Sequence, residues 1–181
     1  LMVGTLEPRK GHALVLDAME RIWKEGRAVQ LVIVGKRGWM VDELVALLRQ
    51  HPEKEHRLHW LEDASDEFLE KLYSKAAALV AASEGEGFGL PLIEAARHGV
   101  PIIARDIPVF REVAGEHAEY FPVEDDPGEL AAYFRGWLDR YSGGRHVQSN
   151  GMSWLTWRES SAQLQAVLEG RRPYRQWLPD G

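Results

Sequence analysis

Two carboxylates, Glu86 and Glu94, stand eight positions apart, one within a glycine-rich stretch and one just beyond it. A short apolar run, 76–82, precedes the stretch, and Pro91 follows it. Proline is typical of the first helical turn, so the pattern predicts a buried strand, a glycine turn and a helix. A carboxylate one turn inside such a helix can accept charge-assisted hydrogen bonds from the vicinal diol of a ribose. The spacing therefore favours a sugar nucleotide as ligand.

The glycine turn supplies a second feature that suits this ligand. Gly87 and Gly89 permit close backbone approaches, and the amides of Phe88, Gly89 and Leu90 are expected near the helix N-terminus, where anions bind. Each acid also has an ordinary structural explanation, because the helix dipole alone favours a carboxylate in a first turn. A functional site at this turn therefore requires cations that offset the acids and the phosphates.

A cation pair, Arg9 and Lys10, precedes Gly11 and a segment whose apolar residues repeat with helical spacing, 14–23. This is the first strand-to-helix turn of the chain. In a doubly wound sheet such turns gather at the carboxyl ends of the strands, so the pair is expected in the same crevice as the glycine turn. Cations at a helix start oppose the dipole, which favours a phosphate-binding role over a solvated helix start.

The remaining pattern alternates between strands and helices. Further strands are expected at 29–34, 57–61, 102–104 and 120–121, and helices near 41–48, 65–69, 109–113 and 127–138. The order predicts an α/β fold, a Rossmann-like doubly wound parallel sheet of about six strands, in one domain at 1–169. A terminal helix at about 153–168 carries an apolar stripe that is expected to pack on this domain, with packing on another domain and partial exposure of the stripe as the alternative. A basic and aromatic tail occupies 170–181.

Composition narrows the functional classes. The 181 residues include 28 acidic and 22 basic side chains, a formal charge of -6 that disfavours nucleic acid as a partner. There is no cysteine, which is compatible with a cytoplasmic location, and no run of eighteen apolar residues that predicts a membrane span. Asp125 and Asp126 precede a Pro-Gly pair, which is typical of a turn and helix start, and the seven histidines form no HExxH motif. No metal site is predicted.

The glycine turn resembles the E-x7-E signature of retaining glycosyltransferases of family four, with Glu86 and Glu94 as its acids. The stretch around Arg9 and Lys10 resembles their phosphate-binding loop, although many relatives have Gly-Arg where this chain has Gly4-Thr5. Further matching stretches follow the second acid and extend the resemblance along nearly the whole chain, at 99–104, 106–108, 111–115 and 153–154. The form of the first loop is most similar to bacterial mannosyltransferases of polysaccharide assembly.

The resemblance implies a GT-B enzyme of two Rossmann-like domains, of which this chain is the C-terminal, donor-binding half, with the N-terminal domain missing. Arg9 and Lys10 would hold the diphosphate, Glu94 the ribose, and Glu86 the transferred sugar, with the amides of the turn completing the site. The donor would be GDP-mannose or a UDP-hexose, with no metal required, and the acceptor would be a glycan or a lipid-linked molecule. The protein would be cytoplasmic, with a peripheral contact of the full-length protein at the inner face of the membrane left open.

Three other functions are open at this point. A nicotinamide-dependent oxidoreductase is disfavoured because the first turn lacks the G-x-G-x-x-G fingerprint. A sugar-nucleotide epimerase shares the GT-B architecture, and product analysis without an acceptor would separate it from a transferase. The third alternative is a donor-binding module that shows no turnover as an isolated chain, which is what the missing domain leads us to expect of this chain in isolation.

Overall fold

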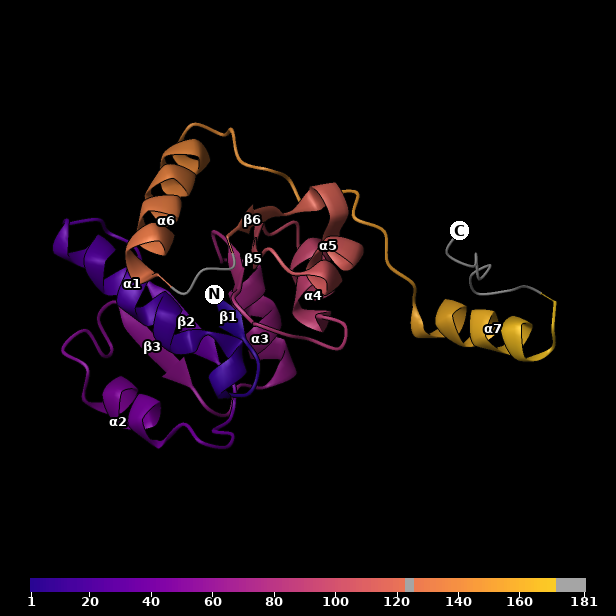
Figure 1. The fold of residues 1–181 in the computed structure, drawn as a ribbon, viewed down its shortest axis with the longest axis horizontal. Coiled ribbons are helices and arrows are strands. Elements are labelled where there is room, and N and C mark those ends of the chain that lie inside the picture. The colour runs from indigo at the N-terminus through magenta and orange to yellow at the C-terminus, as the bar shows by residue number, and fades with distance from the viewer. Residues whose placement is uncertain (123–125, 172–181) are drawn as a thin grey trace, which may run out of the picture.

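The computed structural model describes residues 1–122 and 126–171 (Figure 1). The strands are β1 (Met2–Val3), β2 (Leu31–Val34), β3 (Leu58–Leu61), β4 (Leu79–Ala81), β5 (Ile102–Arg105) and β6 (Glu119–Phe121). The helices are α1 (His12–Lys24), α2 (Asp42–Gln50), α3 (Asp66–Tyr73), α4 (Leu90–Arg97), α5 (Pro108–Ala114), α6 (Pro127–Ser142) and α7 (Trp157–Leu168), with short 3-10 helices η1 (Pro8–Lys10) and η2 (Gly115–His117). Strands and helices alternate as the sequence predicts.

The strands form two parallel three-stranded sheets, ordered β1-β2-β3 and β4-β5-β6. Met2 lies opposite Ile33 in the first sheet, and Ala81 lies opposite Ala104 in the second. The two sheets meet at β1 and β4, where the amide of Val80 donates to the carbonyl of Leu1 at 2.8 Å. The resulting order, 3-2-1-4-5-6, is that of a doubly wound fold, and its switch point lies between β1 and β4. The segments that follow these two strands are therefore brought together.

Helices cover both faces of the strands. One hydrophobic cluster joins the first sheet to α1, α2 and α6, with Trp23 and Trp137 among its buried members. The second joins β4 and β5 to α3, α4 and α5, with Tyr73 and Phe110 buried in it. This division confirms the predicted doubly wound architecture.

The predicted start of α6 is confirmed in detail. Asp126 is its N-cap, and its carboxylate accepts hydrogen bonds from the amides of Gly128 at 2.6 Å and Glu129 at 3.3 Å. A carboxylate in this position satisfies amides that have no partner within the helix. Asp125, the other member of the predicted turn, lies outside the described residues.

The terminal helix differs from the prediction in its start and its surroundings. It begins at Trp157, because Thr156 forms a capping box with Glu159. Figure 1 shows α7 at the end of an extended segment, apart from the rest of the fold, and Trp157 is 83% exposed. The expected contact of its apolar stripe with this domain is therefore wrong for this structure, since the chain leaves the second hydrophobic cluster after Met152. Of the predicted tail, residues 172–181 lie outside the described residues.

Candidate functional site

The loop after β1 and the turn after β4 are joined along their backbones. The amide of Glu84 donates to the carbonyl of Arg9 at 2.8 Å. Gly11, which links η1 to α1, has a φ of 69°, and a Cβ there would lie 2.4 Å from the carbonyl oxygen of Ala82. Only glycine fits such a left-handed, crowded position. The predicted meeting of the two segments is thus a direct contact.

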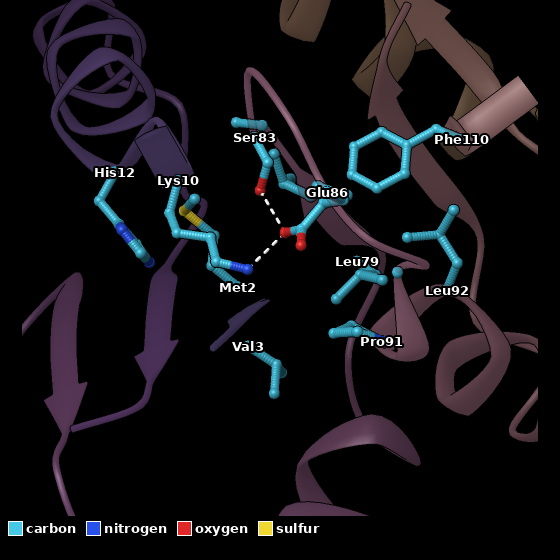
Figure 2. A pocket seen from close by; sticks show the side chains of 14 residues that line it. Met2, Val3, Lys10, His12, Leu79, Ser83, Glu86, Pro91, Leu92 and Phe110 are labelled. Atoms are coloured by element: carbon cyan, nitrogen blue, oxygen red, sulfur yellow. Dashed lines mark hydrogen bonds and ion pairs between the residues drawn. The ribbon is translucent and has the colours of Figure 1, made fainter. Parts of the chain in front are cut away.

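The side chains of these loops meet at the carboxylate of Glu86. Lys10 Nζ pairs with Glu86 Oε1, although the two residues are 76 positions apart. Ser83 Oγ donates to the same oxygen at 2.7 Å, and Arg9 Nη1 lies 3.4 Å from Glu86 Oε2 and 2.6 Å from the carbonyl of Gly85. Figure 2 shows the Lys10 amine and the Ser83 hydroxyl both directed at this carboxylate.

The surroundings of Glu86 favour its ionised form. Burial on its own would raise the pKa of Glu86, but the hydrogen bonds from Lys10 and Ser83 and the nearby charge of Arg9 outweigh it, so its pKa lies below the usual value. The side chains of Glu86 and Lys10 are 14% and 17% exposed. The pair is therefore less screened by solvent than a surface ion pair.

A small cavity lies beside this cluster (Figure 2), and its lining includes Lys10, Glu86, Gly89, Pro91 and Phe110. It offers about 20 Å³ to the centre of a water molecule, which is room for about one water. The two loops are therefore closed on each other in this structure.

Glu94 has a side-chain partner that its spacing did not predict. It lies on α4, and Tyr73 at the end of α3 donates its hydroxyl to Glu94 Oε2 at 2.8 Å. Burial, and next the neighbouring carboxylate, raise the pKa of Tyr73 far above its usual value, so the hydroxyl keeps its proton and acts as a donor. Tyr73 thus fixes the direction of one of the two acids.

The amides at the start of α4 remain available for a ligand. Gly89 is the N-cap in a left-handed conformation, with no side-chain cap, and in the described parts of the chain the N–H groups of Phe88 and Gly89 have no hydrogen-bond acceptor. The first N–H groups of a helix, including that of Leu90, cannot be satisfied within it. The side chains of Phe88 and Leu90 are each 53% exposed.

Three further residues belong to the site but were not among the predicted ones: Ser83, Tyr73 and His12. His12 opens α1, is 3% exposed and lines the same cavity, and its Nδ1 has no hydrogen-bond partner among the described residues. Burial, and then the charge of Lys10, lower the pKa of His12 to about 4. The position next to Lys10 and Gly11 was the available signal for His12. Tyr73 carried no such signal, because its role depends on how α3 packs beside α4.

Comparison with known proteins identifies the family. The sequence profile described as "Glycosyl transferases group 1" matches residues 1–153. The chain belongs to the group 1 glycosyl transferases. Within this family it is 53% identical over 164 residues to the serotype-specific mannosyltransferase WbdA of Escherichia coli, covering 91% of this chain and 20% of that protein. It is also 37% identical over 117 residues to the O-antigen chain mannosyltransferase B of Escherichia coli, covering 64% of this chain and 30% of that protein.

Several solved structures share the fold of this chain. Sucrose-phosphate synthase from Thermosynechococcus elongatus superposes with a TM-score of 0.73 at 22% identity, over 93% of this chain and 45% of that one. Anabaena HepE in complex with UDP-glucose superposes with a TM-score of 0.72 at 21% sequence identity, over 93% of this chain and 48% of that one. Such neighbours are GT-B glycosyltransferases, so the predicted fold is confirmed. The chain spans about a fifth of the length of WbdA.

Two further observations describe what this chain contains. No helix among the described residues is both long and apolar enough to cross a membrane. Within the same residues, no three side chains of His, Cys, Asp or Glu are grouped in a way that would hold a metal ion.

Proposed function

We propose that this chain is the donor-binding domain of a GT-B glycosyltransferase that transfers a hexose, with mannose as the first candidate, from a nucleoside diphosphate sugar to a glycan or lipid-linked acceptor. The observation that carries the proposal is the meeting of Lys10, Arg9 and Glu86 at the switch point of the sheet, in a chain of this family. Mannose is favoured because the relatives WbdA and O-antigen chain mannosyltransferase B are named mannosyltransferases.

The proposed roles follow from charge. When the bond between the sugar and the diphosphate breaks, negative charge accumulates on the leaving group, and in the proposed complex Lys10, Arg9 and the free amides of the turn would lie beside that charge. Preorganised cations and amides of this kind stabilise a transition state strongly, and in the proposed reaction they would supply charge that a metal ion would otherwise provide. Glu86 would then hold the transferred sugar, and Glu94, oriented by Tyr73, the ribose.

By its family resemblance the proposed reaction retains the anomeric configuration, with the acceptor attacking from the face that the diphosphate leaves. Acceptor contacts would come from the missing N-terminal domain, so this chain alone is expected to bind donor without turnover. The proposed location of the protein is the cytoplasm, with peripheral attachment to the inner face of the membrane as the alternative. Nothing in the comparisons favours the epimerase alternative.

A panel of nucleotides tests the proposal directly. Calorimetric titration of the chain with GDP-mannose, UDP-glucose, UDP-N-acetylglucosamine, GDP and UDP would show binding of one base series and identify the base. Glu94→Ala is expected to weaken donor binding by about 10–100-fold, because one or two charge-assisted hydrogen bonds are lost. Glu43→Ala on α2, an exposed position with the same change of charge, should leave affinity unchanged. Equal affinities of the two variants would contradict the proposed role of Glu94.

A further inference from the structure

The cations assigned to the donor's diphosphate already have protein partners in this structure. Lys10 pairs with Glu86, while Arg9 Nε lies 2.9 Å from Glu7 Oε2 and its Nη1 contacts the carbonyl of Gly85. The cavity beside them holds about one water molecule, far less than a diphosphate needs. A diphosphate that binds Lys10 must therefore compete with Glu86 for the lysine.

From this geometry we infer that Glu86 is an internal competitor of the diphosphate: in the empty cleft its carboxylate occupies Lys10, and an incoming diphosphate displaces it and frees it to meet the sugar. The inference rests on the proposed function, because it assumes that a nucleoside diphosphate enters this cleft. It adds a role in donor selection to a residue otherwise assigned to the sugar.

The charges of the two competitors set the direction of the exchange. Glu86 offers Lys10 a single negative charge, whereas a diphosphate offers at least two, and Arg9 is close enough to share them. Breaking the pair without a replacement would leave a lysine and a carboxylate unpaired at 17% and 14% exposure, which is unfavourable. A ligand that lacks phosphate brings no negative charge to replace Glu86 at Lys10. The cleft therefore favours diphosphates over free sugars.

The glycines on either side of Glu86 indicate that the turn adopts a second conformation. Neither Gly85 nor Gly87 has a positive φ, and a Cβ at either position would meet no atom within 4 Å. This closed state therefore does not require glycine at these positions. Two flexible residues that flank the competing carboxylate are what a movement of Glu86 away from Lys10 would need.

The competition also has a consequence after transfer. Once the sugar has left, Glu86 has no ligand, and its return to Lys10 would help to expel the nucleoside diphosphate. Because only a fraction of the free protein has Lys10 available, the apparent affinity for diphosphate is lower than the intrinsic affinity by that fraction. Removing the competitor should therefore tighten binding of the diphosphate, an effect opposite to that expected of a residue that only binds the donor.

Glu86→Gln tests this prediction, with GDP or UDP as the probe, whichever binds the unmodified chain. We expect the variant to bind the diphosphate about three- to tenfold more tightly, corresponding to a competent fraction of roughly 0.1–0.3 in the original protein. Glu84→Gln changes the same charge at an exposed position in the same turn and should alter affinity by less than about twofold. The nucleoside without phosphates should bind both variants as it binds the original chain.

A double variant separates competition for Lys10 from simple repulsion between two anions. In a Lys10→Met background the tightening by Glu86→Gln should disappear, because the pair no longer exists. Tightening of the same size in that background would overturn the inference in favour of repulsion. The competition would also be overturned if Glu86→Gln left diphosphate binding unchanged or weakened it. If Lys10→Met weakened diphosphate binding in the same experiment, the proposed nucleotide site would stand. If no nucleotide binds the original chain, the proposed function fails, and the inference fails with it.

Carbon-13 NMR of the unmodified chain tests the inference without relying on variants that could fail to fold. With carbon-13 in the glutamate side chains, the carboxyl signal of Glu86 should shift when the diphosphate is added and stay in place when the nucleoside is added. The signal of Glu84 should respond to neither. A Glu86 signal that is unaffected by a bound diphosphate would overturn the inference.

Discussion

The two loops that close the cleft both contain glycine, but the fold requires it in only one of them. In the loop after β1, Gly11 has a left-handed backbone, and a Cβ there would collide with the carbonyl of Ala82. In the turn after β4, Gly85 and Gly87 have ordinary backbone angles and open space around them. Glycine at the first position is explained by packing, whereas at the second it points to a movement or a ligand. The first loop is therefore the fixed side of the cleft, and the turn is its adjustable side.

Gly11→Ala is expected to have the largest effect on stability. A Cβ would collide with the backbone of Ala82, and alanine is strained at a φ of 69°, so we expect the free energy of unfolding to fall by about 2–4 kcal/mol. Urea denaturation followed by circular dichroism would measure this. Gly85→Ala is the matched control and should change stability by less than about 1 kcal/mol. Similar losses in both variants would remove the contrast between the two loops.

His12 supplies a pH-dependent test of the fixed side. Its pKa of about 4 in the folded chain lies below the unfolded value of about 6.5, so the unfolded chain binds a proton that the folded chain excludes. The contribution of neutral His12 to the free energy of unfolding is complete above about pH 6.5. It is lost as the pH falls towards 4, which lowers the free energy of unfolding by about 2–3 kcal/mol. Replacing His12 by Leu should remove that part of the pH dependence.

Denaturation of both proteins in urea between pH 7 and pH 4 would measure the difference, because other titrating groups contribute equally to each. Parallel curves would show that His12 is protonated in the folded chain, and thus that the base of this loop admits water more readily than its 3% exposure indicates.

The sequence predicts the elements and their meeting point well, for identifiable physical reasons. Short apolar runs locate most of the strands, and the order of a doubly wound sheet brings Lys10 towards the glycine turn. The direct pairing of Lys10 with Glu86 was not predictable from spacing, because it depends on the side-chain conformations of two loops that meet only in the folded chain. The surroundings of α7 could not be predicted either, because an amphipathic pattern shows which side of a helix is apolar but not which surface it packs on.

Tyr73→Phe has a smaller expected effect, on the orientation of Glu94. The hydroxyl that contacts Glu94 at 2.8 Å is lost while the buried ring is kept, so we expect stability to fall by about 1 kcal/mol. Donor and free nucleoside should both bind about three- to tenfold more weakly if Glu94 holds the ribose. Calorimetry would measure this, and Tyr73→Phe should add nothing in a Glu94→Ala background. Independent losses in the double variant would show that Tyr73 does not act through Glu94.

Gly87→Ala has the smallest expected effect on stability and is the sharpest test of the adjustable side. An added Cβ has open space in this structure, so the free energy of unfolding should stay the same or rise by about 0.4–1 kcal/mol, because alanine restricts the unfolded chain. Binding of the nucleoside diphosphate should nevertheless weaken by about three- to tenfold if glycine is needed in the open conformation or at the phosphates. Gly136→Ala on α6, away from the cleft, should leave binding unchanged. Unaltered binding by Gly87→Ala would mean that the turn is as fixed as the loop opposite it.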